Sequence, residues 1–256
     1  MGVEGWGEGE RSVGVRRDGR CTEVDGYFRV RLGMADPGGV HGIREGMADV
    51  FARHDQLYNF IHAPVQSGSD AVLEDMRRQH RVEKFREIVA TFDDRLDHWT
   101  LSTDFIVGFP TETPEDHERS MELFREVRPE KANGTRFSRR PGTDAADRKG
   151  LGGQVKKDRW KEMSELKREA AAEAYRSMIG DTKEVLAVRA GTGDSMKCRD
   201  DAYRQIIVRD ADERGIQPGD VFEAEVTSHQ TVYAFGEPVA AAEGSQTGPS
   251  ASITTN

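Results

Sequence analysis

Four clusters of small and polar residues follow short apolar runs along the chain. The clusters are Gly33–Pro37, His62–Ser69, Thr103–Glu112 and Arg136–Thr143. Small residues let a ligand approach the backbone, and neighbouring Gln, Ser or Glu side chains can bind ribose hydroxyls, so the set suits a nucleoside. Each cluster alone also fits an ordinary connection between a strand and a helix. Four such clusters in succession along the chain favour a binding site.

The elements that would position these clusters repeat in the order apolar run, turn and amphipathic helix. Strands are expected at Phe28–Met34, Leu57–Val65, Leu101–Phe109 and Ala132–Phe137, and helices at 41–54, 69–76, 82–92, 113–127 and 155–178. Ser69 and Thr113 stand where N-caps are expected, and Pro114 fits the first helical position. Successive strand–helix units predict an α/β fold, with a parallel sheet or part of a (β/α) barrel whose C-terminal strand ends form the site.

After Gly180 the pattern changes to short β-rich runs separated by Gly, Asp and Pro turns. The runs are 185–188, 205–208, 221–226 and 232–235. This spacing predicts a small all-β barrel of about 60 residues. The expected organisation is a loose segment at 1–26, a partial barrel domain at 27–179, the β-module at 180–240 and a disordered Gly/Ser/Thr-rich tail at 241–256.

Charge and hydropathy narrow the class of protein. The net charge of −9 argues against a uniformly basic nucleic-acid-binding surface, so only local basic clusters are informative. Few of the basic residues are Lys, and we hypothesise that an acidic, Lys-poor surface is adapted to concentrated salt; folding that is best in dilute buffer would contradict this. No membrane-spanning run or secretory signal is present, so the cytoplasm is the default expectation.

Cysteine and histidine usage indicates that no metal site is formed by this chain. Cys21 and Cys198 are the two cysteines, and no C-x-x-C pair exists. None of the seven histidines forms an H-x-H or H-x-x-x-H pair. We therefore assign no metal ligands. No nucleophile–base pair stands out either, so we assign no catalytic residues and disfavour a barrel hydrolase.

Three strings make the interpretation more specific. HAPVQSGSDAVLEDMRR (62–78), LSTDFIVGFPTETPED (101–116) and RFSRRPGTDAAD (136–147) resemble the second half of the radical S-adenosylmethionine (SAM) domain of tRNA methylthiotransferases. The β-rich segment resembles the TRAM RNA-binding module. FRVRLGMADPGGVHGIRE (28–45) is most similar to the archaeal and eukaryotic branch, which acts on N6-threonylcarbamoyladenosine beside the tRNA anticodon. The resemblance spans about 27–240.

The resemblance implies particular ligands and site residues. The family uses SAM and [4Fe–4S] clusters, and its RNA partner is tRNA. The SAM-binding residues implied here are Gln66, Ser67, Asp104, Ile106, Gly108, Glu112 and Arg136. The RNA-binding residues implied are Arg140, Lys183, Lys197, Arg199, Tyr203 and Arg204, which combine cations for phosphate with a ring for base stacking.

The chain departs from the family at its metal centre. The family's C-x-x-x-C-x-x-C loop, which holds the cluster, is absent, and so is the N-terminal domain with the second cluster. One hypothesis is a methylthiotransferase whose first half is missing from this sequence or supplied by another chain. A second is an inactive, cluster-free remnant that binds tRNA, and a third is a fragment without function that does not fold stably.

Overall fold

The computed structural model describes residues 27–239, so the segment 1–26 and the tail 241–256 lie outside the described residues. Strands β1 (Phe60–His62), β2 (Thr100–Val107) and β3 (Lys131–Arg136) form a parallel sheet in the order β1-β2-β3. The helices are α1 (Pro37–His41), α2 (Arg44–Arg53), α3 (Asp70–Asp75), α4 (Val82–Arg95), α5 (Pro114–Val127), α6 (Asp144–Asp147) and α7 (Gly153–Arg176).

The first core lies between one face of this sheet and the helices. Alternation along β2 turns Leu101, Phe105 and Val107 into this core. They meet Phe85 of α4 and Phe124 of α5, both essentially inaccessible to solvent. Each such aromatic side chain contributes roughly 1.5–3 kcal/mol on burial. The same alternation turns Ser102, Asp104 and Ile106 to the opposite face, which is free to form a site.

The expected strand at Phe28–Met34 does not form as a regular strand, so three strands rather than four make the sheet. Its backbone makes isolated parallel bridges, from Val30 to Leu57 and from Met34 to His62. Between these two bridges, three residues (31–33) on one side face four (58–61) on the other. This one-residue slip interrupts the ladder of hydrogen bonds that a strand requires.

Two expectations about helices need correction. The helix expected at 41–54 forms as α2, which begins only at Arg44, and a separate short helix, α1, precedes it and ends at His41. Ser69 occupies the N-cap of α3, but its hydroxyl donates to Asp116 Oδ1 at 2.6 Å and does not cap the helix. The Thr113 cap is confirmed, and Thr113 and Asp116 form a reciprocal capping box at the start of α5.

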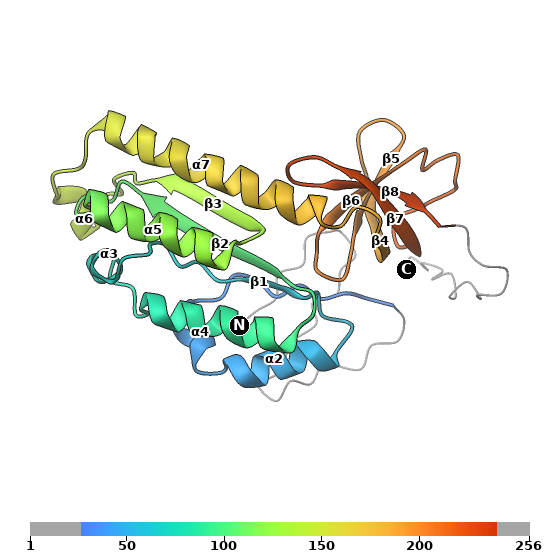
Figure 1. Cartoon of the computed structure of the whole chain (residues 1–256), viewed down its shortest axis with the longest axis horizontal. Coiled ribbons are helices and arrows are strands. Elements are labelled where there is room, and N and C mark those ends of the chain that lie inside the picture. The colour runs from blue at the N-terminus through green and yellow to red at the C-terminus, as the bar shows by residue number, and fades with distance from the viewer. Residues whose placement is uncertain (1–26, 240–256) are drawn as a thin grey trace, which may run out of the picture.

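The C-terminal barrel is confirmed as a closed five-stranded barrel, in the order β4-β5-β6-β8-β7. Its strands are β4 (Thr182–Ala190), β5 (Ser195–Arg199), β6 (Gln205–Arg209), β7 (Val221–His229) and β8 (Ala234–Pro238). Sequence patterning missed β5. Helix α7 lies along β3 and continues to the barrel, so one rigid element joins the two parts (Figure 1).

The joint between the two parts is polar and aromatic. Arg204 of the barrel forms two hydrogen bonds with the carboxylate of Glu130, at 2.9 and 2.5 Å. Lys131 Nζ donates to the backbone carbonyl of Tyr203 at 2.9 Å. The Tyr203 ring packs on Phe60 of β1, with ring centroids 5.2 Å apart. These contacts hold the barrel beside the amino ends of β1 and β3.

Candidate functional site

An open groove of about 480 Å³ lies over strands β2 and β3. It is lined by Gln66, Asp104, Phe105, Ile106, Asn133, Gly134, Thr135, Arg140 and Lys167. The parallel register sets Asp104 beside Asn133 and Ile106 beside Thr135, so these side chains share one face of the sheet. Among the residues predicted for the site, the groove brings together Gln66, Asp104, Ile106 and Arg140.

Asp104 is the polar centre of the groove. Its Oδ1 accepts a hydrogen bond from Asn133 Nδ2 at 2.8 Å and lies 3.1 Å from His62 Nε2. Burial opposes ionisation of Asp104, but the hydrogen bonds from His62 and Asn133 outweigh it and lower the pKa of the carboxyl. Asp104 is therefore an ionised hydrogen-bond acceptor at neutral pH. An acceptor of this kind suits ribose hydroxyls or an amino group.

Gln66 is held against β2 in an uncommon backbone conformation. Its φ is 72°, which costs a residue other than glycine roughly 1–2 kcal/mol. The Gln66 amide donates to the carbonyl of Asp104 at 2.7 Å, and its carbonyl accepts from the amide of Ile106 at 2.8 Å. Backbone strain that is maintained by such contacts is typical of ligand sites. We therefore treat Gln66 as a candidate ligand-binding residue.

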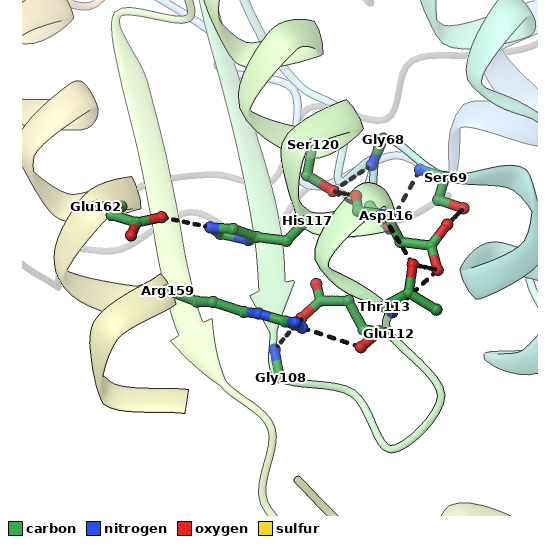
Figure 2. Close-up of polar contacts among 11 residues, drawn as sticks. Gly68, Ser69, Gly108, Glu112, Thr113, Asp116, His117, Ser120, Arg159 and Glu162 are labelled. Atoms are coloured by element: carbon green, nitrogen blue, oxygen red, sulfur yellow. Dashed lines mark hydrogen bonds and ion pairs between the residues drawn. The ribbon is translucent and has the colours of Figure 1, made fainter. Parts of the chain in front are cut away.

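Ser67 does not line the groove, because it is buried against helix α5. Its Oγ lies 3.3 Å from Ser120 Oγ. The amide of Gly68 donates to the same Ser120 hydroxyl at 2.9 Å (Figure 2). A Cβ on Gly68 would lie 2.4 Å from the carbonyl oxygen of Arg119. The loop after Gln66 therefore anchors the site to α5, and glycine is required for this close approach.

Glu112 and Gly108 also lie outside the residues that line the groove. The Glu112 carboxylate accepts a hydrogen bond from the Gly108 amide at 2.7 Å and forms an ion pair with Arg159 of α7 at 2.5 Å (Figure 2). The Glu112 side chain is fully buried. Its role in the structure is to close the loop between β2 and α5. A direct contact between Glu112 and an adenosyl group finds no support in this placement.

Arg136 lies on the other face of the sheet from Asp104. It pairs in register with Val107, whose side chain belongs to the core, and its guanidinium lies 5.8 Å from the ring centroid of Trp160 on α7. Arg136 therefore does not line the groove. Arg140, which follows it in the loop after β3, does.

The residues predicted to bind RNA are divided among three places: Arg140 lines the groove, and the others lie at the joint or on the barrel strands β4 and β5. Arg199, Tyr203 and Arg204 lie at the joint, where the Arg199 guanidinium is 4.3 Å from the centroid of the Tyr203 ring and Arg204 is paired with Glu130. Lys183 pairs with Asp181 at 3.1 Å. Lys197 is partly exposed on β5. The joint contacts explain the basic and aromatic character of the first three residues without a ligand.

Sequence reasoning missed four residues that line the groove: Asn133, Gly134, Thr135 and Lys167. It also missed His62 as a partner of Asp104. Asn133 carried a usable signal, because alternation within the expected strand 132–137 separates it from Ala132 and Gly134. Lys167 carried none, since it was one cation among several on a long helix. Its burial beside the groove lowers the pKa of its amino group.

An iron–sulfur cluster does not fit the donors of this chain. Among the described residues, no group of three His, Cys, Asp or Glu side chains is placed to hold a metal ion. Cys198 is buried in the barrel, and burial raises the pKa of its thiol to about 12, so it is not a ready thiolate ligand. None of the described helices is long and apolar enough to cross a lipid bilayer.

Comparison with known families defines the class of the sheet-containing part. Residues 26–124 match the model of the Radical SAM superfamily, and this part of the chain belongs to that superfamily. The cofactors of that superfamily are SAM and a [4Fe–4S] cluster, as the resemblance implied, although this chain lacks the cluster ligands. Coproporphyrinogen III oxidase from Escherichia coli, a solved radical SAM enzyme, is similar over 76% of this chain and 50% of its own, with 16% identity and a TM-score of 0.46.

Curated relatives are named tRNA methylthiotransferases, which confirms the family resemblance seen in the sequence, while the TRAM resemblance stays a prediction. A probable threonylcarbamoyladenosine tRNA methylthiotransferase from Archaeoglobus fulgidus is 38% identical over 75% of this chain and 45% of its own length. A probable threonylcarbamoyladenosine tRNA methylthiotransferase from Pyrococcus horikoshii is 36% identical over 84% of this chain and 49% of its own length. A tRNA-2-methylthio-N(6)-dimethylallyladenosine synthase from Streptomyces viridosporus is 34% identical over 81% of this chain and 41% of its own length. The chain spans about half the length of these relatives.

Proposed function

We propose that this chain forms part of a radical SAM tRNA methylthiotransferase, and that its groove binds the adenosyl group of SAM. The proposed reaction adds a methylthio group to C2 of N6-threonylcarbamoyladenosine beside the anticodon. The archaeal relatives support this substrate by name. The single observation that carries the proposal is the polar groove around Asp104, which lies on the superfamily-matched strand β2.

The chemistry of the groove residues suits an adenosyl group. The Asp104 carboxylate and the Asn133 amide offer an acceptor and a donor for ribose hydroxyls. Ile106 offers an apolar surface for the adenine ring. Arg140 and Lys167 bring positive charge to the same groove, which suits the carboxylate of the methionine part.

The metal chemistry would come from cysteines outside these residues. In the family, a [4Fe–4S] cluster supplies the electron that cleaves SAM. Since this sequence has two cysteines, it cannot provide the three ligands of that cluster. What we assign to this chain is the binding and orientation of the adenosyl group, together with contact to tRNA.

We further propose that the C-terminal barrel is a TRAM-like RNA-binding module spanning about 180–240. Its size and position after the radical SAM part support this assignment. Lys183 and Lys197 are the predicted RNA-binding residues that lie away from the contacts at the joint. A tRNA substrate would place the protein in the cytoplasm.

A second candidate function is favoured by the cysteine content. A cluster-free protein that binds tRNA without modifying it would need neither the cysteine loop nor SAM. Binding of S-adenosylhomocysteine, measured by isothermal titration calorimetry, separates the two. The methylthiotransferase proposal requires this ligand to bind, whereas the second candidate requires binding of tRNA alone. Absence of both would contradict both functions.

The substitution Asp104→Asn, measured by the same calorimetry, tests whether S-adenosylhomocysteine binds in the groove. Loss of a charged hydrogen-bond acceptor costs about 1.5–3 kcal/mol, so binding of S-adenosylhomocysteine should weaken roughly ten- to one-hundredfold. Glu118→Gln is the matched control, because Glu118 is an exposed carboxylate on α5 that pairs with Arg125. An equal effect of the two substitutions would place the ligand elsewhere.

A further inference from the structure

An exposed aromatic side chain adjoins the groove. Trp160 of α7 is 41% exposed, as is Val155 near the start of the same helix, whereas Met163 and Leu166 of α7 pack in the core. Its indole Nε1 donates to the carbonyl of Gly134 at 3.0 Å. Gly134 itself lines the groove, so the indole ring is fixed at the groove's edge.

Cations lie close to this ring and in the adjoining groove. The Arg136 guanidinium lies 5.8 Å from the centroid of the Trp160 ring. Lys156, one helical turn before Trp160, packs over Gly108, while Arg140 and Lys167 line the groove. Within residues 27–239, no carboxylate lies within ion-pair distance of these cations, whereas neighbouring Arg159 and Lys161 are paired with Glu112 and Glu165.

We propose that Trp160 and Arg136 form a stacking platform for an unpaired RNA base next to the adenosine that is modified, an inference that rests on the proposed function. An aromatic face with nearby cations matches unpaired RNA, since the ring stacks on a base and the cations neutralise phosphates. A duplex buries its base faces and cannot use the ring in this way. These groups bring positive charge close to the ring in a chain with a net charge of −9.

The test uses the full chain and a fluorescently labelled anticodon stem–loop RNA, with binding followed by anisotropy. Trp160→Ala should weaken binding roughly five- to one-hundredfold, while Trp160→Phe should retain most of the affinity. Arg136→Gln should weaken binding less and reduce its dependence on salt. Lys161→Ala is the matched control, because Lys161 lies next to Trp160 on α7 and is paired with Glu165 at 3.8 Å.

Tryptophan fluorescence provides a second readout that does not depend on the alanine variant folding. Stacking of a base on Trp160 should quench the emission of the wild-type protein, and Trp160→Phe should lose that quenching while still binding RNA. If the wild type binds RNA but Trp160→Ala and Trp160→Phe change neither affinity nor quenching, the platform is wrong and the proposed function stands. If the wild type does not bind RNA, the tRNA partner and the platform both fail.

Discussion

Arg159 of α7 binds both the side-chain carboxylate of Glu112, at 2.5 Å, and its backbone carbonyl, at 3.0 Å. Both side chains are buried, and the same carboxylate also accepts the amide of Gly108. The ion pair therefore ties the loop after β2 to the long helix that carries Trp160 and Lys167. One ion pair therefore fixes the position of α7, which carries residues of both the groove and the proposed platform, relative to the loop after β2.

Breaking this ion pair should destabilise the protein strongly. Arg159→Met would leave the Glu112 carboxylate buried without its charged partner, which costs about 3–5 kcal/mol in the free energy of unfolding. Equilibrium unfolding in urea measures the loss. Arg125→Met, in the exposed pair with Glu118, should cost less than about 1 kcal/mol. Losses of equal size would contradict the importance of the buried pair.

Gly108→Ala should cost more than Gly142→Ala. Both glycines have positive φ, 75° and 80°, so both substitutions incur a backbone cost of roughly 1–2 kcal/mol. Only at Gly108 would the new Cβ also lie 2.4 Å from Lys156 Cγ, whereas nothing lies within 4 Å at Gly142. Urea unfolding measures the free energy of unfolding of both variants, and the difference between their losses is the steric cost at Gly108. Identical losses would show that Lys156 moves away freely.

The joint predicts a pH dependence of stability. Burial raises the pKa of Asp200 to about 6, and its Oδ2 has no hydrogen-bond partner. Between about pH 4 and 6 the unfolded chain releases this proton before the folded protein does. The contribution of Asp200 to stability therefore falls as the pH rises through this window, by about 1–3 kcal/mol, and is constant above it.

Asp200→Asn should abolish that fall. Asp104 and Asp116 have lowered pKa values and act in the opposite sense, so the informative quantity is the difference between wild type and variant. Thermal unfolding at several pH values from 4 to 7 measures it. A difference that does not change with pH would show that Asp200 titrates normally.

The cysteine content predicts the result of anaerobic reconstitution with iron and sulfide. The chain alone should show no absorbance of a [4Fe–4S] cluster, because it lacks three cysteines on one loop and Cys198 is buried. Iron content and visible spectra measure this. A stable cluster on the chain alone would contradict our assignment of the metal centre to other residues.

Much of the fold was predictable because local chemistry and tertiary packing agree. The Thr113-Pro114 cap fixed the start of α5, and the long helix was found within about two residues of its ends. The prediction of a strand at Phe28–Met34 was wrong, because alternation of apolar residues does not encode the register with the neighbouring segment. Strand β5 was missed because its polar residues alternate with only two buried ones, Met196 and Cys198.

The candidate site was predictable only in part. Asp104, Ile106 and Gln66 come together because parallel strands end at one edge of a sheet. Ser67 and Glu112 carry the same polar chemistry, but packing against α5 and α7 turns them away from the groove. Trp160 gave no signal, since an aromatic residue on a helix is usually part of the core.

The most direct test of the central claim is a titration of the isotope-labelled protein with S-adenosylhomocysteine, followed by amide chemical shifts. The account predicts that the largest shifts occur at Gln66, Ile106, Asn133 and Gly134 around the groove. Shifts confined to the separate groove lined by Gly68, Val82, Arg86 and Arg119, or no shifts at all, would contradict it.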